Sequence, residues 1–256
     1  MIRAEVRVYG ELVGRLEREA SKTRFRPDVD WLHRNQRPPL GLAFLGTPQP
    51  PVVGTRLPAY FENLLPEEGS ALRLWLSQKL GVRNDALALL LKVGRDLTGA
   101  VEVTQEETGE TSLPSPSDAT GDSPEIRFSL AGMQLKMSMV RQGERFAFPA
   151  RSKSGRWIIK FPGESYVGLP EVEAATMDWA AAMSLPVPKF AVFSFDQLEG
   201  IENIQFVNPP PKVFGIERFD RRNDGRLHQE DMAQALGLFP EQKYAGNGAV
   251  TTDSPA

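Results

Sequence analysis

Apolar and charged residues alternate near the amino terminus. The alternation runs from Ala4 to Val8, and after a turn at Gly10 the apolar positions resume from Leu12 to Leu16. A period of two is typical of a strand with one buried face, so these residues predict a β-hairpin. Two further apolar segments separated by prolines are also interpreted as strands: 25–31 and 40–45.

After residue 51 the spacing of the apolar positions changes to that of helices. Pro58 is expected to begin a short helical stretch, and two leucine-rich helices should follow it. Their expected first and last caps are Ser70 with Gly81, and Asn84 or Asp85 with Gly94. The leucines are interpreted as core residues, because leucine is among the residues most often buried. Residues 1–103 should therefore form a compact α+β unit.

Residues 104–124 are almost free of apolar side chains and rich in Pro, Ser, Thr and Glu. Such a segment cannot bury enough apolar surface to offset the entropy lost on ordering. We interpret it as a linker or loop between two parts of the chain.

Strand-like alternation resumes beyond this linker. The segment 126–161 predicts a meander of about four antiparallel strands with glycines between them. A helix should then begin near Pro170, with Val172, Ala175, Trp179 and Met183 at helical spacing, and end before Pro186-Val187-Pro188. The remaining expected elements are strands at 190–193 and 213–220 and a last helix from about His228 to Gly237.

Composition restricts the classes of function. Of the 256 residues, 41% are hydrophobic and 25% charged, as in soluble globular proteins, and a net charge of −3 gives no case for direct nucleic-acid binding. The absence of cysteine and the presence of only two histidines argue against a metal site of the zinc type. Neither a signal-type leader nor a long apolar run is found, so we expect no membrane association and a cytoplasmic protein.

Three features of the second half could carry chemistry together. Residues 129–136 predict a strand–turn–strand with small residues at the bend, where backbone N–H groups can approach phosphate oxygens. Lys160 closes the apolar run 157–159, and a buried ammonium needs an anionic partner. Glu173, in the helix that follows, is placed to pair with it. Each feature also has an ordinary interpretation: a plain hairpin, a lysine that reaches solvent, and a first-turn glutamate.

These segments resemble the HipA family of serine/threonine kinase toxins. The resemblance rests on SLAGMQLK, WIIKFP, ERFDRR, LHQEDMAQALG and KYAG, together with AYFENLLPEEG and LLLKVGRDLTGAVEV in the first half, and it extends over residues 1–248. It implies an α+β fold in which an amino-terminal subdomain precedes a protein-kinase-like small lobe with an antiparallel sheet and one main helix. The implied divisions are the amino-terminal subdomain 1–103, linker 104–124, small lobe 125–214, and hinge with the start of the large lobe 215–256.

The resemblance also implies roles for individual residues. Ser129 would be the autophosphorylated serine, and Lys160 the nucleotide-binding lysine that Glu173 holds in position. The segment 228–231 begins the large lobe and is expected to be structural. The loop that covers the phosphates and the hinge that contacts adenine would comprise Ala131, Gly132, Met133, Gln134, Leu135 and Lys136, and Glu217, Arg218 and Phe219 respectively.

ATP and magnesium are the cofactors that the family implies, and a HipB-like DNA-binding antitoxin is the implied partner. The D-x-H-x-K-N catalytic motif and the second metal-binding aspartate of the family are not found after Phe219. The chain is therefore expected to be truncated at its carboxyl end, without catalytic residues or magnesium ligands. An apolar patch should be exposed where a large lobe would pack. The alternatives are a non-enzymatic module that binds the antitoxin, or a decayed gene fragment.

Overall fold

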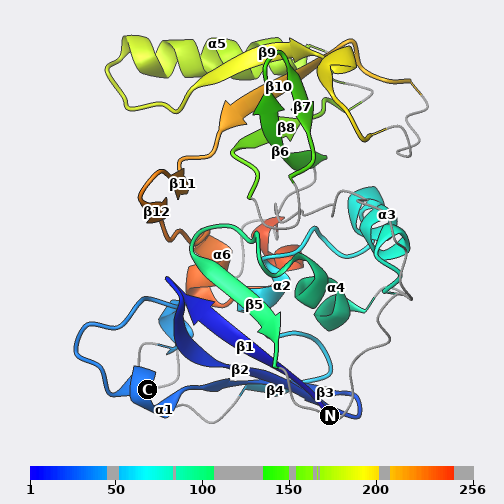
Figure 1. Ribbon diagram of the computed structural model, residues 1–256. Coiled ribbons are helices and arrows are strands. Elements are labelled where there is room, and N and C mark those ends of the chain that lie inside the picture. Colours follow the sequence, from blue (N-terminus) through cyan, green and yellow to red (C-terminus); the bar gives the residue numbers. More distant parts are fainter. Residues whose placement is uncertain are drawn as a thin grey trace.

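The computed structural model contains two five-stranded sheets at opposite ends of the molecule, with several short helices between them (Figure 1). The residues that it describes are 1–44, 52–82, 85–106, 135–149, 154–163, 166, 168–201 and 208–244.

The amino-terminal sheet is antiparallel and has the order β4-β3-β2-β1-β5. Its strands are β1 (Ile2–Val8), β2 (Glu11–Glu19), β3 (Lys22–Pro27), β4 (Val52–Gly54) and β5 (Val101–Gln105). The predicted hairpin is confirmed, because β1 pairs with β2 and the alternating Ala4, Val6 and Val8 are fully buried. Because β5 continues to Gln105, the linker predicted from 104 begins inside a strand, while residues 107–124 lie outside the described part of the chain.

Helices α1 (Val29–Leu32), α2 (Ala59–Glu62), α3 (Ala71–Lys79) and α4 (Ala86–Val93) connect β3 with β5, along with a 3-10 turn, η1 (Leu42–Phe44). The predicted N-caps of α3 and α4 are confirmed at Ser70 and Asp85, and Gly94 caps the end of α4 as predicted. The C-cap of α3 is Leu80, and the predicted Gly81 is the left-handed residue that follows it. The Ser70 side chain accepts a hydrogen bond from the Arg73 N–H, and the Asp85 carboxylate accepts one from the Ala88 N–H.

One predicted strand in this half is confirmed only in part, and another is wrong. The segment 25–31 leaves the sheet at Pro27, because the Asp28 carboxylate accepts hydrogen bonds from the backbone N–H groups of Asp30 and Trp31 and so begins α1. In the segment 40–45, residues 42–44 form η1 rather than a strand.

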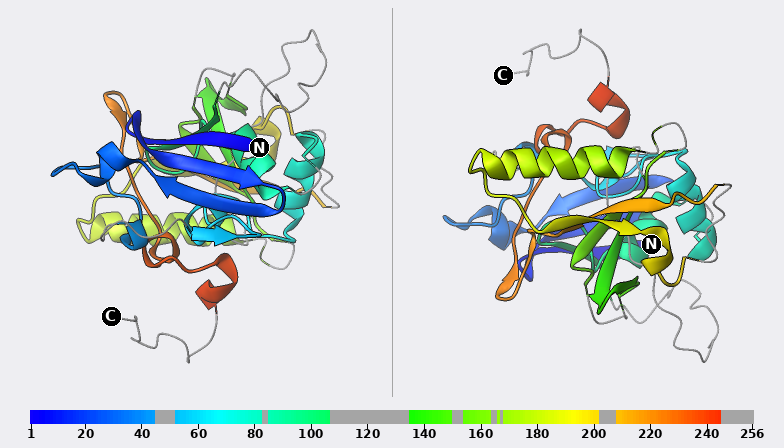
Figure 2. Two further views of the ribbon diagram at one scale, coloured as in Figure 1. Left: turned by 90° about the horizontal axis from the view of Figure 1, so that it is seen from below. Right: turned by 90° about the horizontal axis from the view of Figure 1, so that it is seen from above.

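The second sheet is also antiparallel and has the order β7-β6-β8-β10-β9. Its strands are β6 (Lys136–Gln142), β7 (Arg145–Ala147), β8 (Trp157–Lys160), β9 (Phe190–Ser194) and β10 (Lys212–Glu217), and a 3-10 turn, η2 (Phe195–Gln197), follows β9. Helix α5 (Leu169–Ala182) runs beside β9 and β10, as the view from above shows (Figure 2). The first strand predicted for this half, 126–130, lies outside the described residues.

The last described elements return to the first half of the chain. They are β11 (Arg221–Arg222), β12 (Gly225–Arg226), α6 (Met232–Leu236) and a 3-10 turn, η3 (Pro240–Tyr244). Helix α6 packs against α2 and η1 (Figure 1). It begins at Met232 rather than near His228, because the Asp231 carboxylate accepts the Gln234 N–H and thereby caps the helix, and it ends at left-handed Gly237 as predicted.

The segment 228–231 contacts the first half of the chain directly. The His228 N–H donates to the Tyr9 hydroxyl over 2.9 Å, and the Gly41 N–H donates to Glu230 Oε1 over 2.8 Å. Burial would raise the pKa of Glu230, but hydrogen bonds from His228 and Gly41 outweigh it and lower this pKa. These residues therefore hold the carboxyl-terminal elements against the first half.

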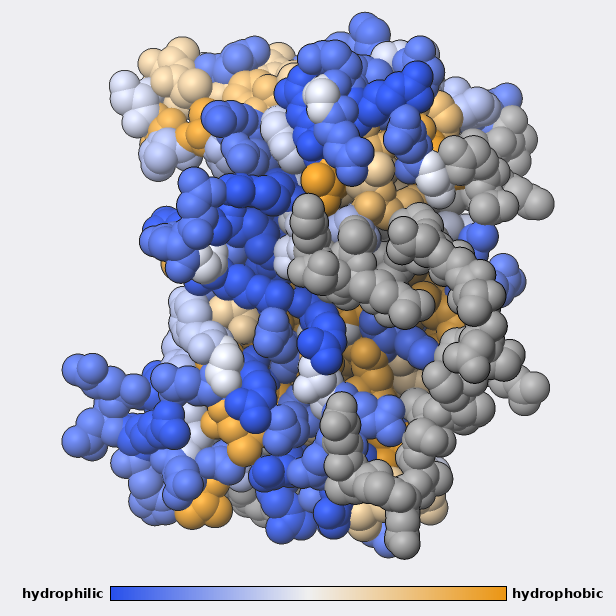
Figure 3. All heavy atoms as spheres, in the orientation of Figure 1, coloured by the Kyte–Doolittle hydropathy of each residue, from blue (hydrophilic) through white to orange (hydrophobic). Residues whose placement is uncertain are grey.

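One continuous cluster of buried apolar side chains extends from Ala4 in β1 to Val213 in β10. Several large apolar side chains remain outside it. On α5 and just beyond it, Val172, Trp179 and Met183 are exposed, so the apolar positions predicted for this helix do not face the core. Phe219, Met232 and Leu236 are exposed as well. Apolar residues are visible at the end of the molecule that carries α5, whereas the surface at the level of β11 and β12 is hydrophilic (Figure 3).

Candidate functional site

Lys160 and Glu173 form an ion pair between the second sheet and α5. Lys160 is the last residue of β8, and its Nζ donates to Glu173 Oε2. The two side chains are largely buried, with 23% and 17% exposed. The Lys160 ammonium also lies 5.3 Å from the centre of the Phe214 ring, which is opposite it on β10. The ammonium is thus fixed in place at the end of the sheet rather than extended into solvent.

A second lysine lies across the ladder from this pair. Lys136 begins β6 and is directly opposite Lys160 in the register. Burial and the nearby positive charge of Lys160 lower the pKa of Lys136, while Glu173 acts in the opposite direction. Two lysines at facing positions of a ladder favour an anion near them, and the carboxylate of Glu173 is one. Lys243 contributes to the same positive field and is anchored to Asp231 Oδ2 at 2.9 Å; the sequence reasoning did not single it out.

Of the loop predicted to cover phosphates, only Leu135 and Lys136 are described. The Leu135 carbonyl accepts the Phe161 N–H over 2.9 Å, which joins the end of this loop to the strand of Lys160. The predicted residues Ser129, Ala131, Gly132, Met133 and Gln134 lie outside the described residues.

The predicted hinge, 217–219, begins at the end of β10. The Glu217 N–H donates to the Lys189 carbonyl over 2.7 Å, and the Arg218 N–H donates to the Arg156 carbonyl over 2.8 Å. These two N–H groups are therefore engaged within the protein and are not free to bind a base. The side chain of Phe219 is 53% exposed. A groove of about 570 Å³ lies beside the hinge and is lined by Arg156, Pro186, Val187, Pro188, Glu217, Arg218, Phe219, Arg221, Arg222 and Asn223.

The side chain of Arg218 points into the interior, where it belongs to a set of polar residues that we call the hinge cluster: Asp96, Ser138, Arg218, Asp220 and Arg221. Arg218 Nη1 donates to Asp96 Oδ1 over 3.2 Å and to Ser138 Oγ over 3.1 Å. Its Nε and Nη2 donate to the two carboxylate oxygens of Asp220 over 2.9 and 2.8 Å. This bidentate geometry is the strongest form of a charge-assisted hydrogen bond.

Arg221 completes the hinge cluster. Its Nη2 donates to Asp96 Oδ1 and its Nη1 to Asp220 Oδ2, over 2.8 and 2.9 Å. Burial favours the neutral forms of Arg218 and Asp220, yet the two aspartates raise the pKa of Arg218, and the two arginines lower the pKa of Asp220. Burial and the positive charge of Arg218 lower the pKa of Arg221. The cluster thus pairs two arginines with two aspartates, so that their formal charges balance. The sequence reasoning did not single out Asp96 or Asp220, because each is distant in sequence from part of the cluster.

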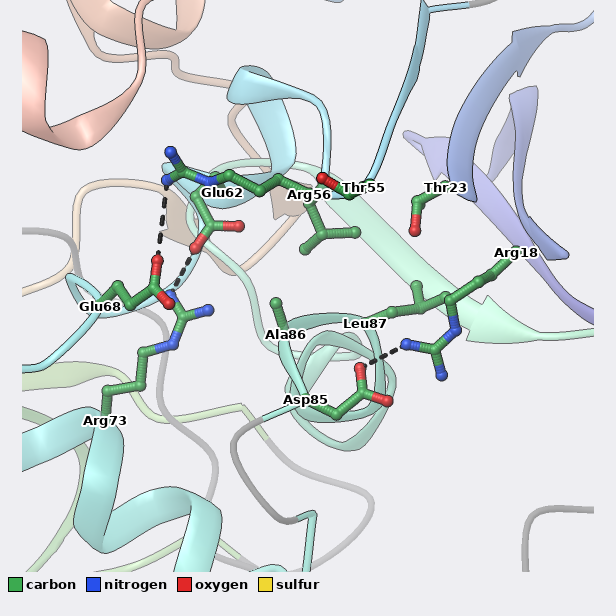
Figure 4. A pocket seen from close by; sticks show the side chains of 11 residues that line it. Arg18, Thr23, Thr55, Arg56, Glu62, Glu68, Arg73, Asp85, Ala86 and Leu87 are labelled. Atoms are coloured by element: carbon green, nitrogen blue, oxygen red, sulfur yellow. Dashed lines mark hydrogen bonds and ion pairs between the residues drawn. The ribbon is translucent and has the colours of Figure 1, made fainter. Parts of the chain in front are cut away.

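A polar pocket of about 280 Å³ lies in the amino-terminal half, beside α3 and α4 (Figure 4). Its arginines are paired with carboxylates: Arg18 with Asp85 at 2.6 Å, Arg73 with Glu62 at 2.6 Å, and Arg56 with Glu68 at 3.8 Å. These opposite charges match within the pocket, so its polarity is explained by internal pairing.

Across the ranges that the structure describes, no group of three or more His, Cys, Asp or Glu side chains could hold a metal ion. Within the same ranges, none of the helices combines the length and the apolar character needed to cross a membrane.

Two protein-family models match the chain, one in each half. The model of the HipA N-terminal domain matches residues 4–104, and the model of the HipA-like C-terminal domain matches residues 128–253.

Relatives resemble the chain over most of its length. Y4dM of Sinorhizobium fredii, whose name designates a kinase, is 35% identical over 94% of this chain and 61% of its own length. The serine/threonine-protein kinase toxin HipA of Shewanella oneidensis is 29% identical over 81% of this chain and 50% of its own length. The chain therefore spans about half to three fifths of these curated relatives.

A solved structure shows the same fold. It contains HipA of Shewanella oneidensis with HipB and operator DNA, and it matches with a TM-score of 0.60 and 23% sequence identity. The match covers 96% of this chain and 59% of that one. Because both halves match the two HipA domain models in order, the chain belongs to the HipA family.

Proposed function

We propose that this chain is the nucleotide-binding part of a HipA-type serine/threonine kinase of a type II toxin–antitoxin system. The observation that supports this most directly is the ion pair between Lys160 and Glu173. A lysine at a strand end, held by a glutamate on the next helix, is the arrangement by which protein kinases direct an ammonium toward nucleotide phosphates.

The residues around the pair fit the chemistry of ATP. Lys160 and Lys136 lie at one end of the second sheet, where two positive charges would meet the α- and β-phosphates. The hinge at 217–219 lies at the far end of β10, where its carbonyl groups and the Phe219 N–H would meet the adenine edge. Phe219 would cover the base, and the side chain of Arg218 faces the interior instead. Residues 131–134 remain proposed for covering the phosphates, and Ser129 for autophosphorylation.

Magnesium is the other cofactor that the family implies. The described residues include no carboxylate cluster that fits a metal ion, so we derive no step through one. The catalytic aspartate motif of the family is not found in the sequence. We therefore propose that this chain binds ATP but transfers no phosphoryl group by itself. Incubation with radiolabelled ATP and magnesium should leave the protein unlabelled, and label on Ser129 would contradict this statement.

Calorimetric titration of the full chain with ATP tests the proposed site. Lys160→Met and Glu173→Gln should each weaken ATP binding at least tenfold, because the first removes the ammonium and the second releases it from its position. The matched control is Lys212→Met, which removes an exposed lysine paired with Glu171 on the same sheet and helix. This control should bind ATP like the unaltered chain. Equal losses in all three variants, or no ATP binding by the unaltered chain, would refute the proposal.

Binding of a HipB-like antitoxin is a second candidate function. It is favoured by the shared fold with a HipA structure that was solved together with HipB. Co-expression with a HipB-like helix-turn-helix protein should yield a complex, and that complex should survive Lys160→Met because the substitution affects only the nucleotide site. Loss of the complex in this variant would show that the partner needs the nucleotide site.

A further inference from the structure

The segment that joins α4 to β5 enters the second half of the molecule. We call residues 94–100, Gly-Arg-Asp-Leu-Thr-Gly-Ala, the clamp loop. The clamp loop belongs to the amino-terminal subdomain by sequence, yet its polar groups bond chiefly to residues of the small lobe and hinge. The family motif that contains it carries no role in the proposed nucleotide chemistry.

Asp96 is the centre of these contacts and is completely buried. Its Oδ1 accepts hydrogen bonds from Arg218 and Arg221, at 3.2 and 2.8 Å for their nearest nitrogens. Its Oδ2 accepts from Ser138 Oγ over 3.3 Å and from the Gly155 N–H over 3.2 Å. One carboxylate thereby joins β6, the loop before β8, the hinge and β11.

The backbone of the clamp loop binds the same arginines. The Leu97 carbonyl accepts from Nη2 of Arg218 and of Arg221 over 3.2 and 2.6 Å, and the Gly99 carbonyl accepts from Arg221 Nη1 over 2.8 Å. In return, the Gly99 N–H donates to Asp220 Oδ2 over 2.9 Å. With Asp96, Ser138 and Asp220, these acceptors satisfy the fork of donors that each guanidinium presents.

The clamp loop is packed so closely against its neighbours that two of its positions have no room for a side chain. Gly99 has a φ of +73°, and a Cβ there would lie 2.8 Å from the backbone nitrogen of Gln229. A Cβ on Gly94 would lie 1.9 Å from the Val103 carbonyl oxygen. The loop is therefore held against its own strand on one side and against the carboxyl-terminal segment on the other.

We infer that Asp96 is a positioning residue for the nucleotide site: it fixes the hinge from the neighbouring subdomain through Arg218. The inference rests on the proposed function and deepens it. Arg218 lies between Glu217 and Phe219, so the direction of its side chain sets the orientation of the backbone groups on either side. Because the five donors of Arg218 are held by the hinge cluster and the clamp loop, the hinge cannot rotate without breaking several charged hydrogen bonds at once.

The inference predicts a selective loss. Asp96 acts on the adenine end of the site, whereas Lys160 acts on the phosphate end and is not part of the hinge cluster. Asp96→Asn keeps the shape of the side chain but removes its charge and part of its capacity to accept hydrogen bonds. We expect this variant of the full chain to bind ATP at least tenfold more weakly, while its affinity for inorganic tripolyphosphate stays within twofold of the unaltered chain. A general loss of structure would lower the affinity for ATP and for tripolyphosphate together.

Glu62→Gln supplies the matched control. Glu62 forms an equally buried ion pair with Arg73, with 3% of each side chain exposed, and it lies in the same subdomain away from the hinge. This variant should bind both ligands within twofold of the unaltered chain at a temperature where each variant is folded by circular dichroism. If Asp96→Asn binds ATP normally, or if Glu62→Gln loses ATP to the same extent, the inference is wrong.

Amide hydrogen exchange separates this inference from the proposed function. Asp96→Asn should accelerate exchange of the Glu217 and Arg218 N–H groups, which donate to Lys189 and Arg156, and Glu62→Gln should not. This comparison remains decisive even if the unaltered chain binds no ATP. Should Asp96→Asn fail to fold, Ser138→Ala removes a single partner of Arg218 and should produce a smaller change in the same amides. Unchanged exchange at 217–218 in the folded variants would overturn the inference.

Discussion

Gly155 lies where the loop before β8 meets β6. A Cβ at this position would be 2.1 Å from Ser138 Oγ and 2.8 Å from the Met139 backbone nitrogen, so no side chain can be added without moving one of the two segments. The absence of a side chain is what lets the Gly155 N–H reach Asp96.

We therefore expect Gly155→Ala to reduce the free energy of unfolding by about 1 to 3 kcal/mol, the range typical of an overpacked interior. Gly163→Ala is the control, because nothing lies within 4 Å of a Cβ there. Chemical denaturation of both variants measures the difference. Equal stability of Gly155→Ala and the unaltered chain would mean that the loop moves away freely.

At the scale of a residue, sequence reasoning recognised what Lys160 could pair with but not where Arg218 points. The distance along the chain explains the difference. Lys160 and Glu173 are 13 residues apart and follow each other on a strand and the next helix. Arg218 and Asp96 are 122 residues apart, and no periodicity in the sequence relates them. An arginine beside the predicted hinge would ordinarily be expected to lie at the surface. Arg218 is buried instead, because Asp96, Ser138 and Asp220 accept its hydrogen bonds in the interior.

Helix α4 shows how one side chain can perform two tasks at an element's end. Asp85 caps the helix by accepting the Ala88 N–H, and it also accepts a hydrogen bond from Arg18 on β2 over 2.6 Å. Burial would raise the pKa of Asp85, but the hydrogen bond from Arg18 and those from the helix backbone lower it below its ordinary value of 3.8.

A lowered pKa means that ionised Asp85 stabilises the folded state at every pH above its ordinary value, and that this contribution is lost as the pH falls through the lowered pKa. Asp85→Asn should keep the cap, because asparagine caps helices as well as aspartate does, but lose the ion pair. Its deficit in stability, about 1 kcal/mol or less at neutral pH, should shrink as the solution becomes acidic. Denaturation curves of Asp85→Asn and the unaltered chain, recorded between neutral pH and pH about 3, measure this difference in the free energy of unfolding.

Ser70→Ala removes the cap of α3 without removing a charge and is the control for that experiment. It should lower the stability by about 1 kcal/mol at every pH. A pH-independent deficit in Asp85→Asn would show that Arg18 does not stabilise the folded state through this carboxylate.

Elements with local signals were the ones that the sequence predicted well. The hairpin of β1 and β2, the N-caps of α3 and α4 and the strands β8 to β10 all follow from period, turn residues or capping residues. The segment 40–45 was predicted to be a strand but contains the turn η1, because a short apolar run bounded by prolines is compatible with both structures. The apolar residues of α5 were expected to face the core for another reason. Helical spacing shows that they lie on one side of the helix, but only the tertiary structure decides whether other elements pack against that side.

For the whole molecule, the two sheets share one apolar cluster, and the hinge cluster joins them by charged hydrogen bonds. We therefore expect differential scanning calorimetry to record a single unfolding transition, with equal calorimetric and van't Hoff enthalpies. Asp96→Asn should lower the stability of the whole chain by about 3 kcal/mol, because it leaves buried arginine charge without full compensation. Two separate transitions in the unaltered chain would contradict this expectation.

The separation between Asp96 and its arginines has a consequence for the order in which the protein folds. The carboxylate is synthesised 122 residues before Arg218, and translation at about 5 to 20 residues per second makes the delay roughly 6 to 25 s. During this interval the neighbouring strands of the first sheet, such as β1 and β2, can pair with each other, while the carboxylate of Asp96 stays hydrated. Docking of the two halves is therefore a late event on the folding path, and it occurs only when the carboxyl-terminal arginines have left the ribosome.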